Sequence, residues 1–114
     1  MTEPGTGGSV PDMTIKLVVL YTQPADPVAF DEHYLSVHMP LVAKLPGLVR
    51  AETGKFTMAL DGGEHTYHRV AQLYFADQDA MNAAFGSPEG AATAADYGSI
   101  APPGSRMLIQ EVDD

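Results

Sequence analysis

Strand-like and helix-like segments follow one another along this chain in the order βαββαβ. The strand-like segments are rich in β-branched and aliphatic residues, and the helix-like segments place apolar residues three and four positions apart. The expected strands are 13–22, 48–58, 66–75 and 106–112, and the expected helices are 27–44, with an interruption near 37–39, and the pair 78–85 and 88–97. These two helical regions, 27–44 and 78–97, can cover only one face of a four-stranded sheet, so the order predicts an α+β fold with one open sheet face.

The strands have one dry face and one mixed face. In 13–22 the odd positions are all apolar or aromatic, whereas the even positions combine Lys16 and threonines with Val18 and Leu20. In 66–75 the mixed face is expected to carry His68 and Gln72. A mixed face without helices predicts cover by a second copy of the same sheet, in a homodimer with C2 symmetry, and a partly wet cavity along that face.

Composition narrows the classes of partner. Six Lys and Arg against fifteen Asp and Glu give a net charge of −9, and no basic cluster is present, so neither nucleic acid nor an anionic membrane is an expected partner. The chain has no cysteine, which fits a cytoplasmic protein, and its longest apolar run within the strands, LVVL, is far too short to span a bilayer. One domain, 13–114, is expected after a flexible, Gly- and Pro-rich tail, 1–12.

The first helix contains a proline. Phe30, Tyr34, Val37 and Leu41 have the spacing of one helix face. Pro40 removes a backbone hydrogen bond and disfavours the helical conformation of the residue before it. We therefore expect the helix to end or kink near 37–39 and to resume through residue 44.

A histidine at this interruption is the leading catalytic candidate. His38 can direct its ring off the helix into the space beside the sheet, where an imidazole is a natural general acid or base at neutral pH. Tyr34, four residues earlier, is the expected donor to a substrate oxygen. The alternative is that His38 only caps the end of the helix.

Four further residues are candidates for ligand binding. His33 lies on the same helix between two acidic residues, although a solvated position fits it as well. His68 and Gln72 would face the cavity or the dimer partner, and Tyr97 would close the mouth of the pocket. The histidine pairs lack the spacing of metal ligands, and no phosphate-binding or dinucleotide-binding glycine motif is present, so we expect neither a metal nor a cofactor.

Together these residues resemble the EthD family. The spacing F-x3-Y-x3-H-x-P-x4-LPG runs from Phe30 to Gly47, and AQLYFADQDAMNAAFGSPEG is similar to the family's later strand and helix, so the likeness covers 13–112. The chain departs from many members in having Tyr34 where Trp is frequent, with His33 beside it. The resemblance implies a ferredoxin-like βαββαβ monomer with a four-stranded antiparallel sheet, pairing into a dimeric α/β barrel.

The resemblance also implies a range of chemistries, because the fold is shared with isomerases, cofactor-free monooxygenases, polyketide cyclases and haem-binding relatives. The leading expectation is a cofactor-independent enzyme of catabolism or secondary metabolism that binds a small apolar, aromatic or polyketide-like molecule. His38 would move a proton during decarboxylation, dehydration, isomerisation or oxygen insertion. One alternative is a non-catalytic metabolite-binding protein, and another is a haem-binding protein using His38 or His68.

Overall fold

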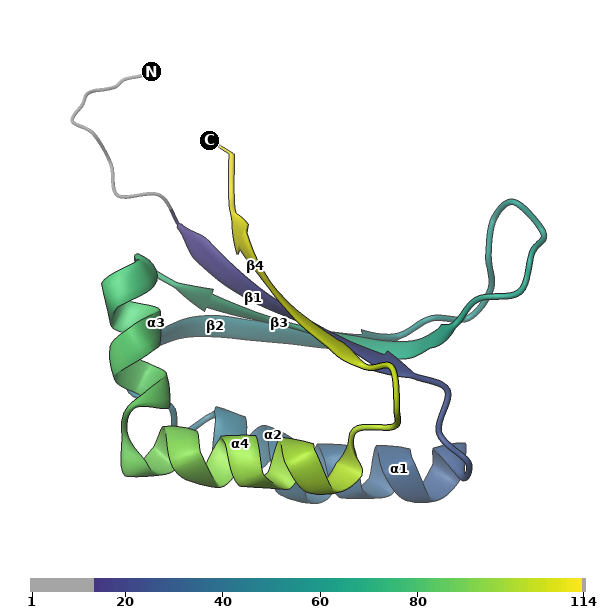
Figure 1. Ribbon diagram of the computed structural model, residues 1–114, viewed down its shortest axis with the longest axis horizontal. Coiled ribbons are helices and arrows are strands. Elements are labelled where there is room, and N and C mark those ends of the chain that lie inside the picture. The colour runs from purple at the N-terminus through teal and green to yellow at the C-terminus, as the bar shows by residue number, and fades with distance from the viewer. Residues whose placement is uncertain (1–13, 114) are drawn as a thin grey trace.

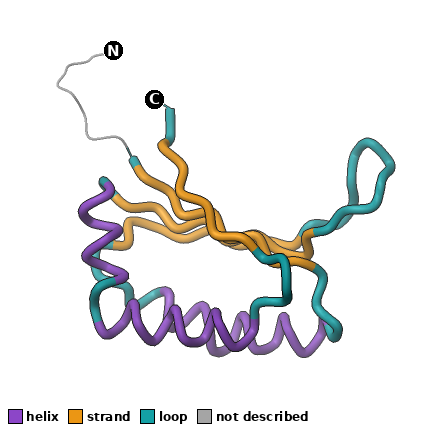
Figure 2. Tube along the Cα trace, in the orientation of Figure 1, coloured by secondary structure: helices purple, strands orange, loops and turns teal. Residues whose placement is uncertain are grey.

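A four-stranded antiparallel sheet forms one layer of the protein, and its helices form the other (Figures 1 and 2). The computed structural model describes residues 14–113, so the predicted tail, 1–12, lies outside the described residues. The strands are β1 (Ile15–Thr22), β2 (Leu48–Lys55), β3 (Tyr67–Phe75) and β4 (Arg106–Glu111), in the sheet order β2-β3-β1-β4. The predicted ferredoxin-like fold is confirmed, with strand ends within three residues of the expected ones.

The helices all lie on one face of the sheet (Figure 1). The first is continuous but changes its winding, and it comprises α1 (Pro27–His33), a π-helical turn (Tyr34–His38) and α2 (Met39–Val42). The second region comprises α3 (Gln78–Phe85) and α4 (Pro88–Ile100). Asp26, Asp77 and Ser87 cap the three helices that begin after loops, each accepting a hydrogen bond from a backbone N–H three residues later. None of the helices within residues 14–113 is long and apolar enough to cross a membrane.

The dry face of the sheet meets the helices and forms the core, as predicted. The alternate residues of β1 and β3 that point to this side are buried, whereas their neighbours are half-buried. The core residues of these two strands are Ile15, Leu17, Val19, Tyr21, Ala71, Leu73 and Phe75. The helices contribute Phe30, Tyr34, Val42, Met81 and Ala84.

The π-helical turn changes which residues of the first helix face the core. The Met39 N–H bonds to the Tyr34 carbonyl, five residues back, so this turn holds more residues than an α-helical turn. The predicted face continued from Tyr34 to Val37, but Val37 is 42% exposed and His38 is buried in its place. That prediction was wrong because it assumed an uninterrupted period of 3.6 residues. The expected interruption near 37–39 is present, but as a change of winding rather than an end of the helix.

A β-bulge changes the facing of His68. Tyr21 lies opposite Arg69 and Thr22 lies opposite Tyr67, which leaves His68 as the extra residue of β3. His68 and Arg69 are consequently both buried toward α1, where both contact Asp31. The expectation that His68 shares the mixed face with Gln72 was wrong, because simple alternation does not hold across a bulge.

Two glycines of α4 give a matched test of this packing. A Cβ at Gly90 would lie 2.5 Å from Phe85 Cα and closer still to the Ala84 carbonyl oxygen, whereas a Cβ at Gly98 would meet nothing within 4 Å. Gly90→Ala is expected to lower the free energy of unfolding by about 1 to 3 kcal/mol, because α4 must move off α3. Gly98→Ala is expected to raise it by about 0.5 to 1 kcal/mol, since alanine favours the helix. Urea unfolding of both variants measures the difference, and equal midpoints would contradict this packing.

Candidate functional site

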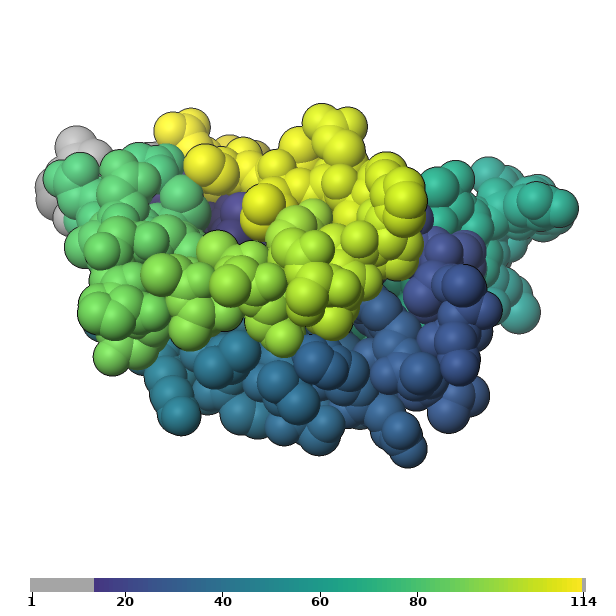
Figure 3. All heavy atoms as spheres, turned by 60° about the horizontal axis from the view of Figure 1, so that its bottom comes forward, coloured from purple at the N-terminus to yellow at the C-terminus, as the bar shows by residue number. Residues whose placement is uncertain are grey.

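A cavity of about 330 Å³ lies between the dry face of the sheet and the helices. In Figure 3 the surface is hollowed between α3 and β4, where atoms of β1 are visible below. The cavity is lined by Leu17, Val19, Tyr21, His38, Val42, Ala71, Leu73, Met81, Phe85, Thr93, Ala94, Tyr97, Met107 and Ile109. It lies on the opposite side of the sheet from the cavity predicted along the mixed face, and there the small side chains Ala71, Thr93 and Ala94 leave space between sheet and α4.

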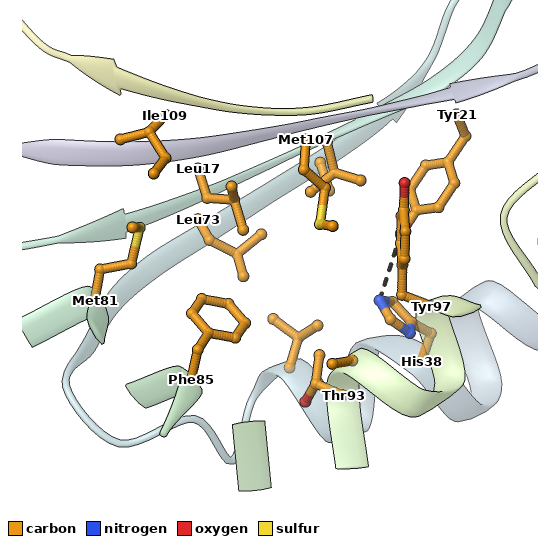
Figure 4. A pocket seen from close by; sticks show the side chains of 14 residues that line it. Leu17, Tyr21, His38, Leu73, Met81, Phe85, Thr93, Tyr97, Met107 and Ile109 are labelled. Carbon is orange, nitrogen blue, oxygen red and sulfur yellow. Dashed lines mark hydrogen bonds between the residues drawn. The ribbon is translucent and has the colours of Figure 1, made fainter. Parts of the chain in front are cut away.

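The cavity has a polar end and an apolar end. His38, Tyr21 and Tyr97 lie together at one end, whereas Met81 and Phe85 lie at the other (Figure 4). Most of the remaining wall is aliphatic. A molecule that fits this space would have an apolar body and one group able to form hydrogen bonds near His38.

His38 is held by a carboxylate behind it. Its Nδ1 lies 2.8 Å from Asp96 Oδ2, and its Nε2 lies 3.4 Å from the Tyr21 hydroxyl. A carboxylate can only accept, so Nδ1 carries the proton of the neutral imidazole and Nε2 is left unprotonated. The 3.4 Å distance is long for a hydrogen bond, so the Nε2 lone pair remains accessible to a ligand.

Asp96 binds two histidines with its two oxygens. Oδ2 accepts from His38, and Oδ1 lies 2.8 Å from His33 Nε2. Burial alone would raise the pKa of this carboxyl, but the hydrogen bonds and charges of His33 and His38 outweigh it and hold the pKa below its ordinary value. Asp96 is therefore a carboxylate at neutral pH. Sequence reasoning missed it; the available signal was an acidic residue in the second half of an alanine-rich helix.

Tyr21 supplies a neutral hydroxyl beside the His38 ring. It is fully buried, and burial is the main cause that raises the pKa of Tyr21. Tyr97 also has a pKa raised by burial, and its ring lies 5.7 Å from that of Tyr21. Both side chains can therefore donate a hydrogen bond to a ligand oxygen. Tyr97 and Tyr21 both line the pocket, and sequence reasoning did not single out Tyr21 as a ligand-binding residue.

Tyr34 is not among the residues that line the cavity. Its hydroxyl lies 3.0 Å from Thr53 Oγ1, and its ring packs against the rings of Phe30 and His38 and against the guanidinium of Arg69. Thr53 Oγ1 donates to the Tyr34 hydroxyl oxygen and accepts from Arg69 Nη1, 3.1 Å away. The predicted role of Tyr34 as donor to substrate stays a prediction, whereas Tyr21 lines the cavity beside His38.

The other predicted ligand-binding residues also lie outside the cavity lining. His33 is not among the residues that line the cavity, and 38% of its side chain is exposed. His68 Nε2 lies 2.9 Å from Asp31 Oδ1, in an ion cluster with Arg69. Gln72 lies on the open face of the sheet near Lys16 and Val18. Only His38 and Tyr97 of the six predicted residues reach the cavity.

Nothing in residues 14–113 forms a group of three or more His, Asp or Glu side chains arranged to hold a metal ion. His33 and His38 converge, but the group between them is the Asp96 carboxylate. The ionisable groups at this end of the cavity are the His38 imidazole, the Asp96 carboxylate behind it and the phenols of Tyr21 and Tyr97.

Comparison with known proteins identifies the family. The EthD domain model matches residues 22–101, more than half of the chain. The chain belongs to the EthD family. An uncharacterized 11.0 kDa protein from the thcB-thcC intergenic region of Rhodococcus erythropolis is 43% identical over 96 residues, which cover 84% of this chain and 92% of the relative.

Solved structures agree with this assignment. An ethyl tert-butyl ether (EthD) family protein from Bacillus halodurans is 33% identical, with a TM-score of 0.84 over 89% of this chain and 100% of that one. SnoaB, a cofactor-independent oxygenase from Streptomyces nogalater, solved as a point mutant, is 19% identical, with a TM-score of 0.66 over 89% of this chain and 94% of that one. At that identity the likeness to SnoaB shows the fold alone.

Proposed function

We propose that this EthD chain is a cofactor-independent enzyme in which His38, supported by Asp96, transfers a proton to or from a small apolar molecule. The observation that carries the proposal is the 2.8 Å contact between His38 Nδ1 and Asp96, which leaves Nε2 as a base at the polar end of the cavity. A carboxylate behind an imidazole fixes its tautomer and stabilises the imidazolium that forms on proton transfer.

In the proposed step, His38 Nε2 takes a proton from an acidic C–H or O–H group of the substrate. The imidazole becomes an imidazolium, whose Nδ1–H remains hydrogen-bonded to Asp96, and the substrate becomes an enolate or phenolate. The Tyr21 hydroxyl, 3.4 Å from Nε2, is placed to donate a hydrogen bond to the oxygen that gains the charge. Return of the proton at another atom would complete an isomerisation, and loss of a leaving group would complete an elimination.

The substrate class follows from the two ends of the cavity. A volume of about 330 Å³ is at the small end of ligand pockets, so a compound of one or two rings fits better than an extended one. The ring would contact Phe85, Met81 and the aliphatic wall, and a carbonyl or phenol oxygen would reach Tyr21. SnoaB, described as a cofactor-independent oxygenase, shares this fold.

The protein is also proposed to act as a homodimer. All six residues of β4 are exposed, including Leu108 on the open face of the sheet, and Val18, Val70 and Phe56 line that face. An open apolar and polar sheet face of this kind is typically covered by another subunit.

The proposal is tested with 1-indanone, a bicyclic ketone whose C–H bonds beside the carbonyl are acidic. In D₂O, the wild-type protein is expected to accelerate deuterium incorporation at that carbon, followed by NMR. Ala94→Phe, which fills the cavity from α4, is expected to reduce the acceleration at least about tenfold by excluding the probe.

Binding of the probe without any acceleration would contradict the enzymatic proposal and favour a metabolite-binding protein instead. The apolar lining favours that second function, because it needs only the cavity and not the base. Equal acceleration by wild type and Ala94→Phe would show that the reaction does not occur in this cavity.

A further inference from the structure

We infer that His33 is a positioning residue that holds the Asp96 carboxylate in place for His38. When the enclosed His38 ring gains a proton, His33 releases one to solvent. The inference rests on the proposed function, because it assigns His33 a part in the same proton transfer. It is carried by the geometry of three side chains, two from the first helix and one from α4.

The π-helical turn brings His33 and His38 to the same carboxylate. Residues five apart in a regular α-helix point about 140° apart, so the two rings would diverge. With the wider turn between them, His33 Nε2 lies 2.8 Å from Asp96 Oδ1 and His38 Nδ1 lies 2.8 Å from Oδ2. Each oxygen of Asp96 is therefore fixed by a different histidine, and the carboxylate cannot rotate away from His38 without breaking the contact to His33.

The three side chains also form a gradient of exposure. The exposed fraction of the side chain is 5% for His38, 13% for Asp96 and 38% for His33. His38 faces a cavity that a bound ligand would close, whereas His33 is partly exposed to solvent. Of these three side chains, His33 is the one placed to exchange protons with solvent.

The charges explain what His33 does for His38. When His38 takes a proton from substrate, one carboxylate would have to balance two imidazolium ions if His33 is already protonated. Release of a proton from His33 to water restores the original net charge of the three side chains. His38 thus gains one proton and His33 loses one. The two histidines thus compete for the same negative charge, and their titrations are coupled.

The other titratable groups near His38 do not supply this coupling. Tyr21 on β1, Tyr34 on its own helix and Tyr97 on α4 are phenols whose pKa values are raised by burial, so they stay neutral. The guanidinium of Arg69 on β3 lies over the ring of Tyr34, 4.8 Å from its centroid, rather than against His38. Asp96 is the carboxylate on which both rings converge.

The test is an NMR titration of the histidine side chains in the free protein, without any substrate. His33→Gln keeps a donor for Asp96 Oδ1 but has no titrating charge. Its titration midpoint for His38 is expected to rise by about 0.5 to 1 pH unit, because the whole carboxylate then favours the protonated ring. His65→Gln, which changes a histidine bonded to the Tyr67 carbonyl, is the control and is expected to leave His38 unchanged.

The reverse variant makes the test independent of any one substitution. If the sites are coupled, His38→Gln is expected to raise the midpoint of His33 as well, by an amount that depends on which ring takes up its proton first. Unchanged midpoints in both variants would overturn the inference. Because no turnover is measured, that result would leave the proposed proton transfer standing, and absent deuterium exchange would leave the coupling standing.

Discussion

His38→Gln is expected to lower the rate of deuterium incorporation into 1-indanone by about 10²- to 10⁴-fold, the usual contribution of a positioned general base. Glutamine has a similar size and can still donate to Asp96, 2.8 Å from the native Nδ1, but it offers no basic nitrogen to the cavity. Binding of the probe, measured by calorimetry, is expected to change by less than about threefold, since most of the cavity wall is apolar and unaltered.

Two comparisons make this result specific. His65→Gln changes a histidine away from the cavity and is expected to retain the wild-type rate. Asp96→Asn keeps a group that can accept from Nδ1 but removes the negative charge, so its rate is expected to fall between those of wild type and His38→Gln. Exchange by His38→Gln at the wild-type rate would remove His38 from the mechanism and leave the cavity as a binding site.

The sequence carried enough information to predict His38 but not its partner. Pro40 marks the turn where the helix winding changes, and a histidine two residues before it was readable as unusual. Asp96 is 58 residues away, and its approach depends on how α4 packs against the first helix. No local pattern records that contact, because alanine-rich helices give little indication of which face is buried.

The remaining differences arise where regular periods fail. The extra residue in the π-helical turn exchanged Val37 for His38 on the buried face, and the bulge in β3 turned His68 toward α1. Strand and helix positions depend on many residues and were predictable to within a few positions. Side-chain directions near a bulge or a π-turn depend on a single inserted residue, so a period counted along the sequence cannot assign them.

The ion cluster around Asp31 is expected to matter for stability rather than for chemistry. Asp31 Oδ1 lies 2.9 Å from His68 Nε2 and 3.3 Å from Arg69 Nε, and Arg69 keeps only 6% of its side chain exposed. Asp31→Ala would leave the Arg69 charge buried without its carboxylate. The expected loss is about 2 to 4 kcal/mol of unfolding free energy, below the value for a fully buried pair because Asp31 is 19% exposed.

The pH dependence of this loss distinguishes the cluster from a simple packing defect. Burial raises the pKa of Asp31, but its hydrogen bonds and charges with His68 and Arg69 lower it more, so the folded value lies below the unfolded one. The carboxylate therefore stabilises the fold above its ordinary pKa, near about 4, and that contribution is lost as the pH falls through the folded value. The difference between wild type and Asp31→Ala in urea unfolding is accordingly expected to be largest near neutral pH and to shrink below about pH 4. Glu52→Ala, which breaks an exposed pair with Arg50, is the control and is expected to change the unfolding free energy far less than Asp31→Ala does. A difference for Asp31→Ala that stays constant from about pH 7 to about pH 3 would mean that the loss comes from packing and not from the ion cluster.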